Sequence, residues 1–121
     1  MKHGRIILEM GTGNDLHGSD YTKAALRAVQ DALHHSSLSL YKSLGLDGNA
    51  MQIKLTIGVQ EPEQIDLNKV AASLPYGTVE AVARLGGVTL AAEGPHDQVV
   101  VATAAIEVFY DIPDHLLQSA S

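Results

Sequence analysis

Residues 99–110 read VVVATAAIEVFY and are rich in the β-branched and aromatic residues that favour strands. In a strand, alternate side chains point to opposite faces of the sheet. One face carries Val100, Ala102, Ala104, Ile106, Val108 and Tyr110, and the other carries Val99, Val101, Thr103, Ala105, Glu107 and Phe109. Both sets are largely apolar. The segment therefore predicts a strand that needs cover on both faces, and this requirement limits the possible folds.

The segments before this strand show alternating strand and helix patterns. Arg5–Met10 predicts a short strand that ends at Gly11-Thr12-Gly13. A polar loop that contains further glycine follows. From there to about His35, apolar side chains recur at helical spacing, and Ser19 or Asp20 can cap the helix that this spacing predicts.

Two further segments extend the pattern. Residues 51–59 alternate strictly between apolar and polar side chains, which predicts a half-buried strand. Asp66 can cap a second, short helix that Pro75 and Gly77 stop. Residues 36–49, which are rich in Ser and Gly, predict at most one helical turn.

Residues 78–92 allow two interpretations. Thr78–Leu85 and Val88–Ala92 flank Gly86-Gly87, and two glycines between apolar runs are typical of a two-residue β-hairpin. A helix over Thr78–Leu85 is the alternative, because this segment contains good helix formers. The glycine pair and the matching apolar sets favour the hairpin.

The order of these elements, β-α-β-α-β-β(-β), predicts a single α+β domain over residues 1–121, with a mixed sheet and two helices on one face. The same order occurs in chorismate-mutase-like and YjgF-like folds, which form trimers with ligand clefts between subunits; ferredoxin-like packing is the alternative. Two helices cover one face of a small sheet. The apolar second face of residues 99–110 therefore predicts a homo-oligomer, a trimer or a larger ring, whereas the alternative is a small monomer with a weakly hydrophobic face.

Composition narrows the classes of function. The 121 residues are 45% hydrophobic and 18% charged, which is low against an average of about 25% charged. The net charge of −6 is a poor match to a phosphate backbone, so nucleic acid and anionic membranes are not expected as partners. The chain has no Cys, which excludes disulfides and thiolate zinc sites. No apolar run is long enough for a signal peptide or a membrane span, and we expect a cytoplasmic protein.

Candidate chemistry is concentrated between Glu9 and Lys23, where a strand, a glycine-rich loop and a helix start follow one another. The free N–H groups of such a helix start favour an anion or an oxyanion. The dinucleotide fingerprint fails because Leu16 stands where its third glycine is needed. Asp15 and His17 can face one cleft, and His exchanges protons near neutral pH. The alternative is a capping loop that only shapes the helix start.

Other polar residues also have structural interpretations. Lys23 lies in the first helical turn and either binds a substrate carbonyl or carboxylate or forms a salt bridge to Asp20 or Asp15. His34 and His35 at the helix end suit the helix dipole and are interpreted as structural or solvated. Neighbouring helical residues diverge by about 100°, so His34 and His35 rarely bind one metal ion together.

The run GTGNDLHGSDYTKAALRAVQDAL (residues 11–33), the strand MQIKLTIGV (51–59) and the late strand VVVATAAIEVFYD (99–111) together resemble a small bacterial family of conserved hypothetical proteins with a GTGxDLHGxDxTKAA motif. The resemblance covers essentially the whole chain. The family implies no established activity, so the resemblance bears on the fold more than on the function.

A shorter stretch resembles the repeating unit of the ring-opening amidohydrolases, the barbiturase and cyanuric acid hydrolase group. Gly13-Asn14 and residues 20–23, DYTK, match the pattern of that unit over about fifteen residues. Those enzymes combine three similar units and use Ser–Lys pairs on a cyclic amide, so a homotrimer of this chain would resemble one in shape. The chain lacks the early lysine of the pattern, and residues 85–88, LGGV, stand where its serine segment is expected.

Together these patterns predict an oligomer that binds a small polar or anionic molecule in a cleft between subunits. If the protein is catalytic, His17 is the general acid or base, Asp15 orients it and Lys23 assists, in the hydrolysis or deamination of a small amide or heterocycle. The candidate binding residues are Gly11, Thr12, Gly13, Asn14, Ser19 and Asp20. No cofactor is expected. The alternatives are a non-catalytic structural or regulatory oligomer and a divalent-metal site through His17 and acids.

Overall fold

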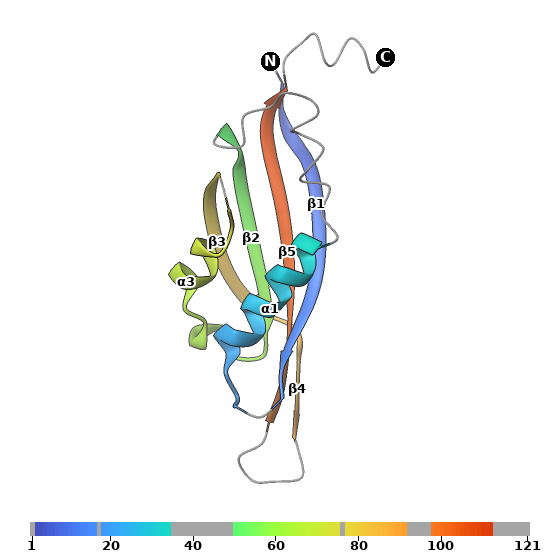
Figure 1. The fold of residues 1–121 in the computed structure, drawn as a ribbon, viewed down its shortest axis with the longest axis vertical. Helices are drawn as coiled ribbons and strands as arrows, with labels where there is room; N and C mark the ends of the chain where they lie inside the picture. The colour runs from blue at the N-terminus through green and yellow to red at the C-terminus, as the bar shows by residue number, and fades with distance from the viewer. Residues whose placement is uncertain (1, 17, 35–49, 76, 92–97, 113–121) are drawn as a thin grey trace.

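The computed structural model of the chain describes residues 2–16, 18–34, 50–75, 77–91 and 98–112. Its strands form one open mixed sheet, and two α-helices pack on one face of it (Figure 1). The elements are β1 (Lys2–Asp15), α1 (Tyr21–His34), β2 (Gln52–Val59), the 3-10 turn η2 (Pro62–Gln64), α3 (Leu67–Ala72), β3 (Thr78–Leu85), β4 (Val88–Ala91) and β5 (Gln98–Ile112). The expected α+β class, with two helices on a mixed sheet, is confirmed. The more specific chorismate-mutase-like assignment stays a prediction.

Strand β5 lies inside the sheet, as its two apolar faces require. The strand order is β1-β5-β2-β3; β5 is antiparallel to β1 and β2, and β3 is parallel to β2. The predicted strand over residues 99–110 is confirmed and is slightly longer. Its alternate residues from Val100 to Val108 are buried on the face that carries the helices.

The core lies between the sheet and the helices. The predicted alternation of residues 51–59 is confirmed, because every apolar residue of that set is buried. The buried residues at this interface, apart from those of β5, are Ile7, Tyr21, Ala24, Ala25, Ala28, Val29, Ala32, Met51, Ile53, Leu55, Ile57, Val59, Ile65, Val70 and Leu74. With one Phe and no Trp in the chain, this core is filled by small and aliphatic side chains.

Helix α1 packs directly on the backbone of β1. A Cβ atom on Gly13 would meet the Ala24 carbonyl oxygen at 2.6 Å and would also meet the Ala28 nitrogen. One on Gly11 would lie 2.6 Å from the Ala28 carbonyl oxygen. Two glycines on one strand face therefore allow a helix face of alanines to approach the strand more closely than any side chain permits.

This packing corrects the expected end of the first strand. The sequence predicted that the strand ends at Met10 and that Gly11-Thr12-Gly13 begins a loop, but β1 continues to Asp15 and pairs with β5 throughout. The glycines are strand residues in contact with a helix and not turn residues. Glycine in a strand can mark either a turn or a close approach, and the sequence does not distinguish them.

The expected hairpin at Gly86-Gly87 is also wrong. Thr78–Leu85 is a strand, as the preferred interpretation required, but β3 pairs with β2 and β4 pairs with β5. The Gly86 N–H donates to the Val59 carbonyl oxygen at 2.9 Å, so the chain crosses the end of β2 at this point. Strand β4 then continues along the edge of β5 that β2 has left, with Val88 opposite Val101.

The two glycines fit this crossover for steric reasons. Gly87 has a φ of 61°, and a Cβ there would meet the carbonyl oxygens of Gly58, at 2.8 Å, and Val101. The side-chain amide of Gln60 donates to the Gly86 and Gly87 carbonyl oxygens at 3.0 and 3.1 Å and holds the crossover in place.

The expected end of the first helix and the expected cap of the second are found in the described residues. Helix α1 ends at His34, and Asp66 caps α3 by accepting the Lys69 N–H at 3.1 Å. Residues 36–49 and His35 lie outside the described residues.

The glycine at position 13 provides a test of the helix–strand contact. We expect Gly13→Ala to lower the free energy of unfolding by about 3 kcal/mol, because the added methyl group must push α1 off β1. Gly4→Ala is the matched control: nothing lies within 4 Å of its added Cβ, and the change should be less than about 1 kcal/mol. Urea unfolding of both variants measures this difference, and equal stabilities would contradict the close packing.

Candidate functional site

The turn between β1 and α1 is organised around the Asp15 carboxylate. This side chain is buried, although it stands at the end of a strand beside an exposed turn. Its Oδ2 atom accepts the backbone N–H groups of Gly18 and Asp20, each at 3.0 Å. Asp15 thus forms the capping turn that the sequence offered as the alternative to a catalytic role.

Two cations from α1 flank the same carboxylate. The Lys23 Nζ atom lies 3.9 Å and the Arg27 Nη1 atom 3.7 Å from Asp15 Oδ1, and both side chains are about half exposed. The hydrogen bond from Asp20 lowers the pKa of Asp15 below its usual value, burial opposes this shift, and the Gly18 N–H and the two cations reinforce it. A carboxylate held ionised in this way is a weak proton acceptor at neutral pH.

The other candidate residues of this segment have packing or capping roles. Asp20 caps α1, because its Oδ1 atom accepts the Lys23 N–H at 3.0 Å. The Thr12 N–H donates to Asp31 Oδ2 at 2.9 Å, and the Asn14 carbonyl oxygen accepts from Arg27 at 2.7 Å. Ser19 has a φ of 50° and precedes the cap. His17 lies outside the described residues.

A shallow pocket of about 450 Å³ opens beside this turn, lined by Asp15, Leu16, Gly18, Asp20, Lys23 and Arg27. Two carboxylates and two cations balance its charge, and the cations already contact Asp15. The sequence identified Asp15 and Lys23 but missed Arg27, which stands one helical turn after Lys23 on the same face. That spacing was the signal that could have found it.

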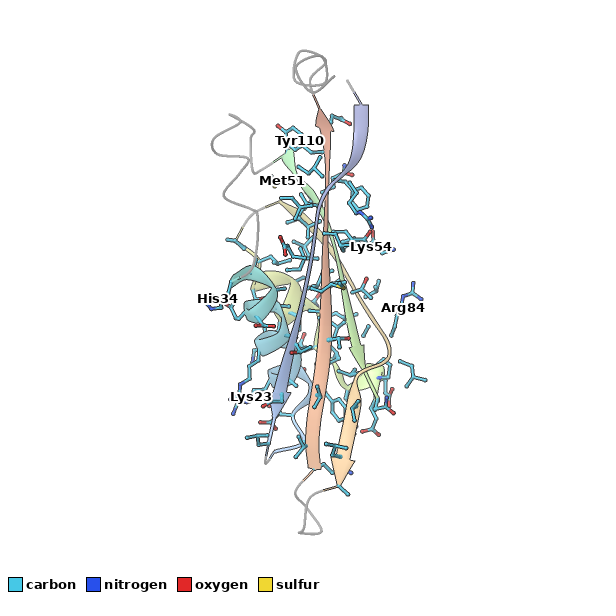
Figure 2. The ribbon with its side chains drawn as sticks, turned by 90° about the vertical axis from the view of Figure 1, so that its right-hand side faces the viewer. Lys23, His34, Met51, Lys54, Arg84 and Tyr110 are labelled. Carbon is cyan, nitrogen blue, oxygen red and sulfur yellow. The ribbon has the colours of Figure 1, made fainter. Side chains whose placement is uncertain are left out.

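A second pocket lies on the opposite side of the molecule. The sequence did not predict that the residues lining it form one site. The helices leave one face of the sheet uncovered, and Lys54 and Arg84 extend from that face, away from Lys23 and His34 (Figure 2). Here a pocket of about 550 Å³ crosses all four strands of the main sheet path and reaches Asp31 of α1 at the β1 edge. We call it the threonine hollow and define it by Thr12, Thr56, Gly58, Arg84, Gly86 and Thr103.

The sheet register brings these residues together. Thr12 pairs with Thr103, Thr103 with Gly58, and Gly58 with Arg84, so one row runs through β1, β5, β2 and β3. Gly58 has no side chain, and the Thr103 hydroxyl occupies the space beside it, with Oγ1 2.5 Å from where a Cβ would stand. Within the described ranges, Arg84 has no ion-pair partner, and the hydroxyls of Thr12, Thr56 and Thr103 make no hydrogen bond.

In the described part of the chain, no three His, Asp or Glu residues lie close enough together to hold a metal ion. No helix within those ranges is long and apolar enough to span a membrane. His34 ends α1, as expected, and is exposed.

Comparisons with known proteins identify the family of the chain. A family described as "Conserved hypothetical protein (Lin0512_fam)" matches residues 5–108. The chain belongs to this family. A crystal structure described as an FtsZ-like protein of unknown function, from Nostoc punctiforme PCC 73102, superimposes with a TM-score of 0.80 at 33% identity and covers 93% of this chain and 99% of that one. A search of curated proteins found no match.

The Lin0512 family assignment confirms the predicted resemblance to conserved hypothetical proteins. It assigns no activity, so the site has to be argued from the residues themselves. The likeness to ring-opening amidohydrolases stays a prediction.

The buried Asp15 carboxylate makes stability depend on pH. The pKa of Asp15 is lower in the folded than in the unfolded protein, so its stabilisation is complete above the unfolded value of about 4 and is lost as pH falls through the folded pKa. We expect Asp15→Asn to cost about 2 kcal/mol at pH 7, because the turn loses its ionised acceptor. Urea unfolding at pH 7 and pH 3 should show a smaller difference between the two proteins at pH 3, whereas an equal difference at both pH values would contradict this role.

Proposed function

We propose that the protein binds a small anionic molecule in the threonine hollow, through Arg84. The observation that carries the proposal is the Arg84 guanidinium, which has no ion-pair partner among the described residues. Arg84 shares one row of the sheet with Gly58, which has no side chain, and with Thr12 and Thr103, whose hydroxyls make no hydrogen bond there. In a chain of net charge −6, Arg84 is an exposed cation that no carboxylate of the described residues neutralises.

The chemistry of the hollow suits a carboxylate or phosphate group. The planar guanidinium presents paired N–H donors that match two oxygens of such a group. Threonine hydroxyls at positions 12, 56 and 103 supply further donors around the pocket. A volume of about 550 Å³ is within the usual range for small-molecule sites.

The hollow is a better anion site than the pocket beside α1. There, Lys23 and Arg27 already face the Asp15 carboxylate, and Asp20 adds a second negative charge. An anion entering that pocket would compete with a buried carboxylate for the same cations. The Asp31 carboxylate also lines the hollow, where it accepts the Thr12 N–H at 2.9 Å, but among the described residues no ion pair joins a carboxylate to Arg84.

The proposal is for binding and not for a reaction. Asp15, the expected partner of a catalytic His17, is committed to two backbone N–H groups and two cations. The catalytic interpretation of His17, Asp15 and Lys23 therefore stays a prediction with a competing structural role for Asp15. The placement of the ligand between subunits and the cytoplasmic location also stay predictions.

Titration of the protein with inorganic phosphate and with a panel of small dicarboxylates, followed by calorimetry, tests the proposal. We expect at least one probe to bind and Arg84→Gln to weaken it at least tenfold, since a charge-assisted hydrogen bond contributes about 1.5–3 kcal/mol. Thr103→Val keeps the shape of the side chain but removes its hydroxyl, and should weaken binding by a smaller factor.

Lys23→Gln is the control in this experiment, because it removes one cation from the pocket beside α1 and leaves the hollow unchanged. Binding should persist in this variant. A loss of binding in Lys23→Gln with none in Arg84→Gln would place the site beside α1 and overturn the proposal. So would the failure of every probe to bind the unaltered protein at millimolar concentration.

A further inference from the structure

We propose that the uncovered sheet face docks onto the same face of a second copy, related by a two-fold axis that runs parallel to the strands. A second copy of the chain fits this face because the order of charges across the face is complementary to itself. The inference does not depend on anion binding at Arg84, and the experiments below use none of the residues that define the threonine hollow.

The uncovered face carries most of the exposed large apolar side chains of the described residues. Met10 is 68% exposed, Leu90 54%, Val88 48% and Leu8 44%, and by strand register these side chains lie on the side away from the helices. Val99, Val101, Ala105 and Phe109 on β5 share this side. A patch of this kind on a small protein marks a surface that binds another molecule.

Four charged side chains cross this face in alternating order. Arg5 on β1 forms an ion pair with Glu107 on β5, with Nη1 3.2 Å from Oε2. Glu107 pairs in register with Lys54 on β2, and Lys54 pairs with Glu80 on β3. From β1 to β3 the charges therefore run plus, minus, plus, minus, in what we call the charge row.

A two-fold axis along the strands makes this row its own complement. Rotation about that axis keeps each level of the sheet opposite itself but reverses the order of the strands, so β1 of one copy faces β3 of the other. Glu107 then faces Lys54, twice over. Arg5 pairs in register with Phe109 and so lies level with Thr78, and its side chain, which extends to Glu107, is placed to reach Glu80 one step along the strand. Isologous contacts of this kind are the commonest in homo-oligomers, and aligned face-to-face packing is usual for sheets.

The apolar side chains and the charges have different roles in this contact. Exposed ion pairs contribute little to affinity, so burial of Met10, Leu90 and their neighbours has to drive association. The charge row selects the orientation, because a two-fold axis across the strands would place each charge of the row opposite its own copy. The same rotation places Arg84 of one copy opposite Thr12 of the other, which would close the hollow from above.

Charge reversal followed by mixing tests the proposed orientation. In Lys54→Glu and in Glu107→Lys, each self-contact would place two pairs of like charges in the centre of the row. When the two variants are mixed, every facing pair is again opposite in sign. We expect the unaltered protein to sediment as a dimer or as a multiple of two, each variant alone to dissociate at least tenfold more readily, and the mixture to restore the dimer.

Two further sets of variants keep this test decisive. Arg5→Glu and Glu80→Lys form a second complementary pair at the outer positions of the row and should behave in the same way. Lys69→Glu, on α3, makes the same charge change as Lys54→Glu but on the helix side, and should leave association unchanged. Circular dichroism of each variant shows that dissociation does not follow from unfolding.

A cysteine cross-link reports the orientation directly, because the chain has no cysteine of its own. Met10 and Val82 share one level of the sheet, through Ala105 and Thr56, but lie three strand spacings or about 14 Å apart within one copy. Facing Cα atoms of two packed sheets lie about 10 Å apart, beyond the reach of a disulfide, so the cross-link needs a short bis-maleimide. Each variant carries a single cysteine, and treating a mixture of Met10→Cys and Val82→Cys with this reagent should give the mixed cross-linked dimer.

Three outcomes would overturn the proposal. The first is an unaltered protein that is monomeric at 100 µM or that sediments as a trimer. The second is a pair of charge-reversed variants that associate as well alone as together. The third is a mixture treated with the bis-maleimide that gives no cross-link between positions 10 and 82. If the protein is a monomer that still binds phosphate through Arg84, the proposed contact between copies is ruled out and the proposed function is unaffected.

Discussion

The contact between α1 and β1 is the constraint on which the rest of the structure depends. Gly11 and Gly13 allow the backbone of the helix to lie against the backbone of the strand, and any side chain at either position would separate them. This contact fixes the face of the sheet that α1 covers, and α3 packs on that same face beside β2 and β3. The core is consequently one-sided. The apolar side chains of β1 and β5 that point the other way are left at the surface.

A second close approach, at the other end of the sheet, shapes the uncovered face. Gly58 and the crossover at Gly86-Gly87 bring three backbone segments together at the end of β2. Gly58 allows the Thr103 hydroxyl and the crossover to lie close to the β2 backbone beside the hollow, and the crossover carries the chain to the free edge of β5. Backbone contacts through glycine therefore shape both the core and one side of the open pocket. The proposed ligand site and the proposed contact between copies both lie on the face that this arrangement leaves open.

Periodic patterns in the sequence predicted the secondary structure well, and the glycines were predicted poorly. The alternation of residues 51–59 and 99–110 fixes both strands, and the spacing of alanines fixes α1. Gly11-Thr12-Gly13 and Gly86-Gly87 were interpreted as turns because glycine favours turns. The residues of a strand do not by themselves show which strand it pairs with. Asp15 was identified as important because it stands beside a helix start. Its role as a buried cap depended on Arg27 and on two backbone N–H groups that only the folded turn aligns.

The sequence by itself determined that the chain is an α+β protein whose last strand is apolar on both faces, because side-chain periodicity reports burial directly. It also determined the family, through residues spread over most of the chain. The tertiary structure decided which strands are neighbours and therefore which side chains share a row. Thr12, Thr103, Gly58 and Arg84 are far apart in the chain, and so are Arg5, Glu107, Lys54 and Glu80. Register across a sheet arises from pairing between distant segments, and no local pattern encodes it.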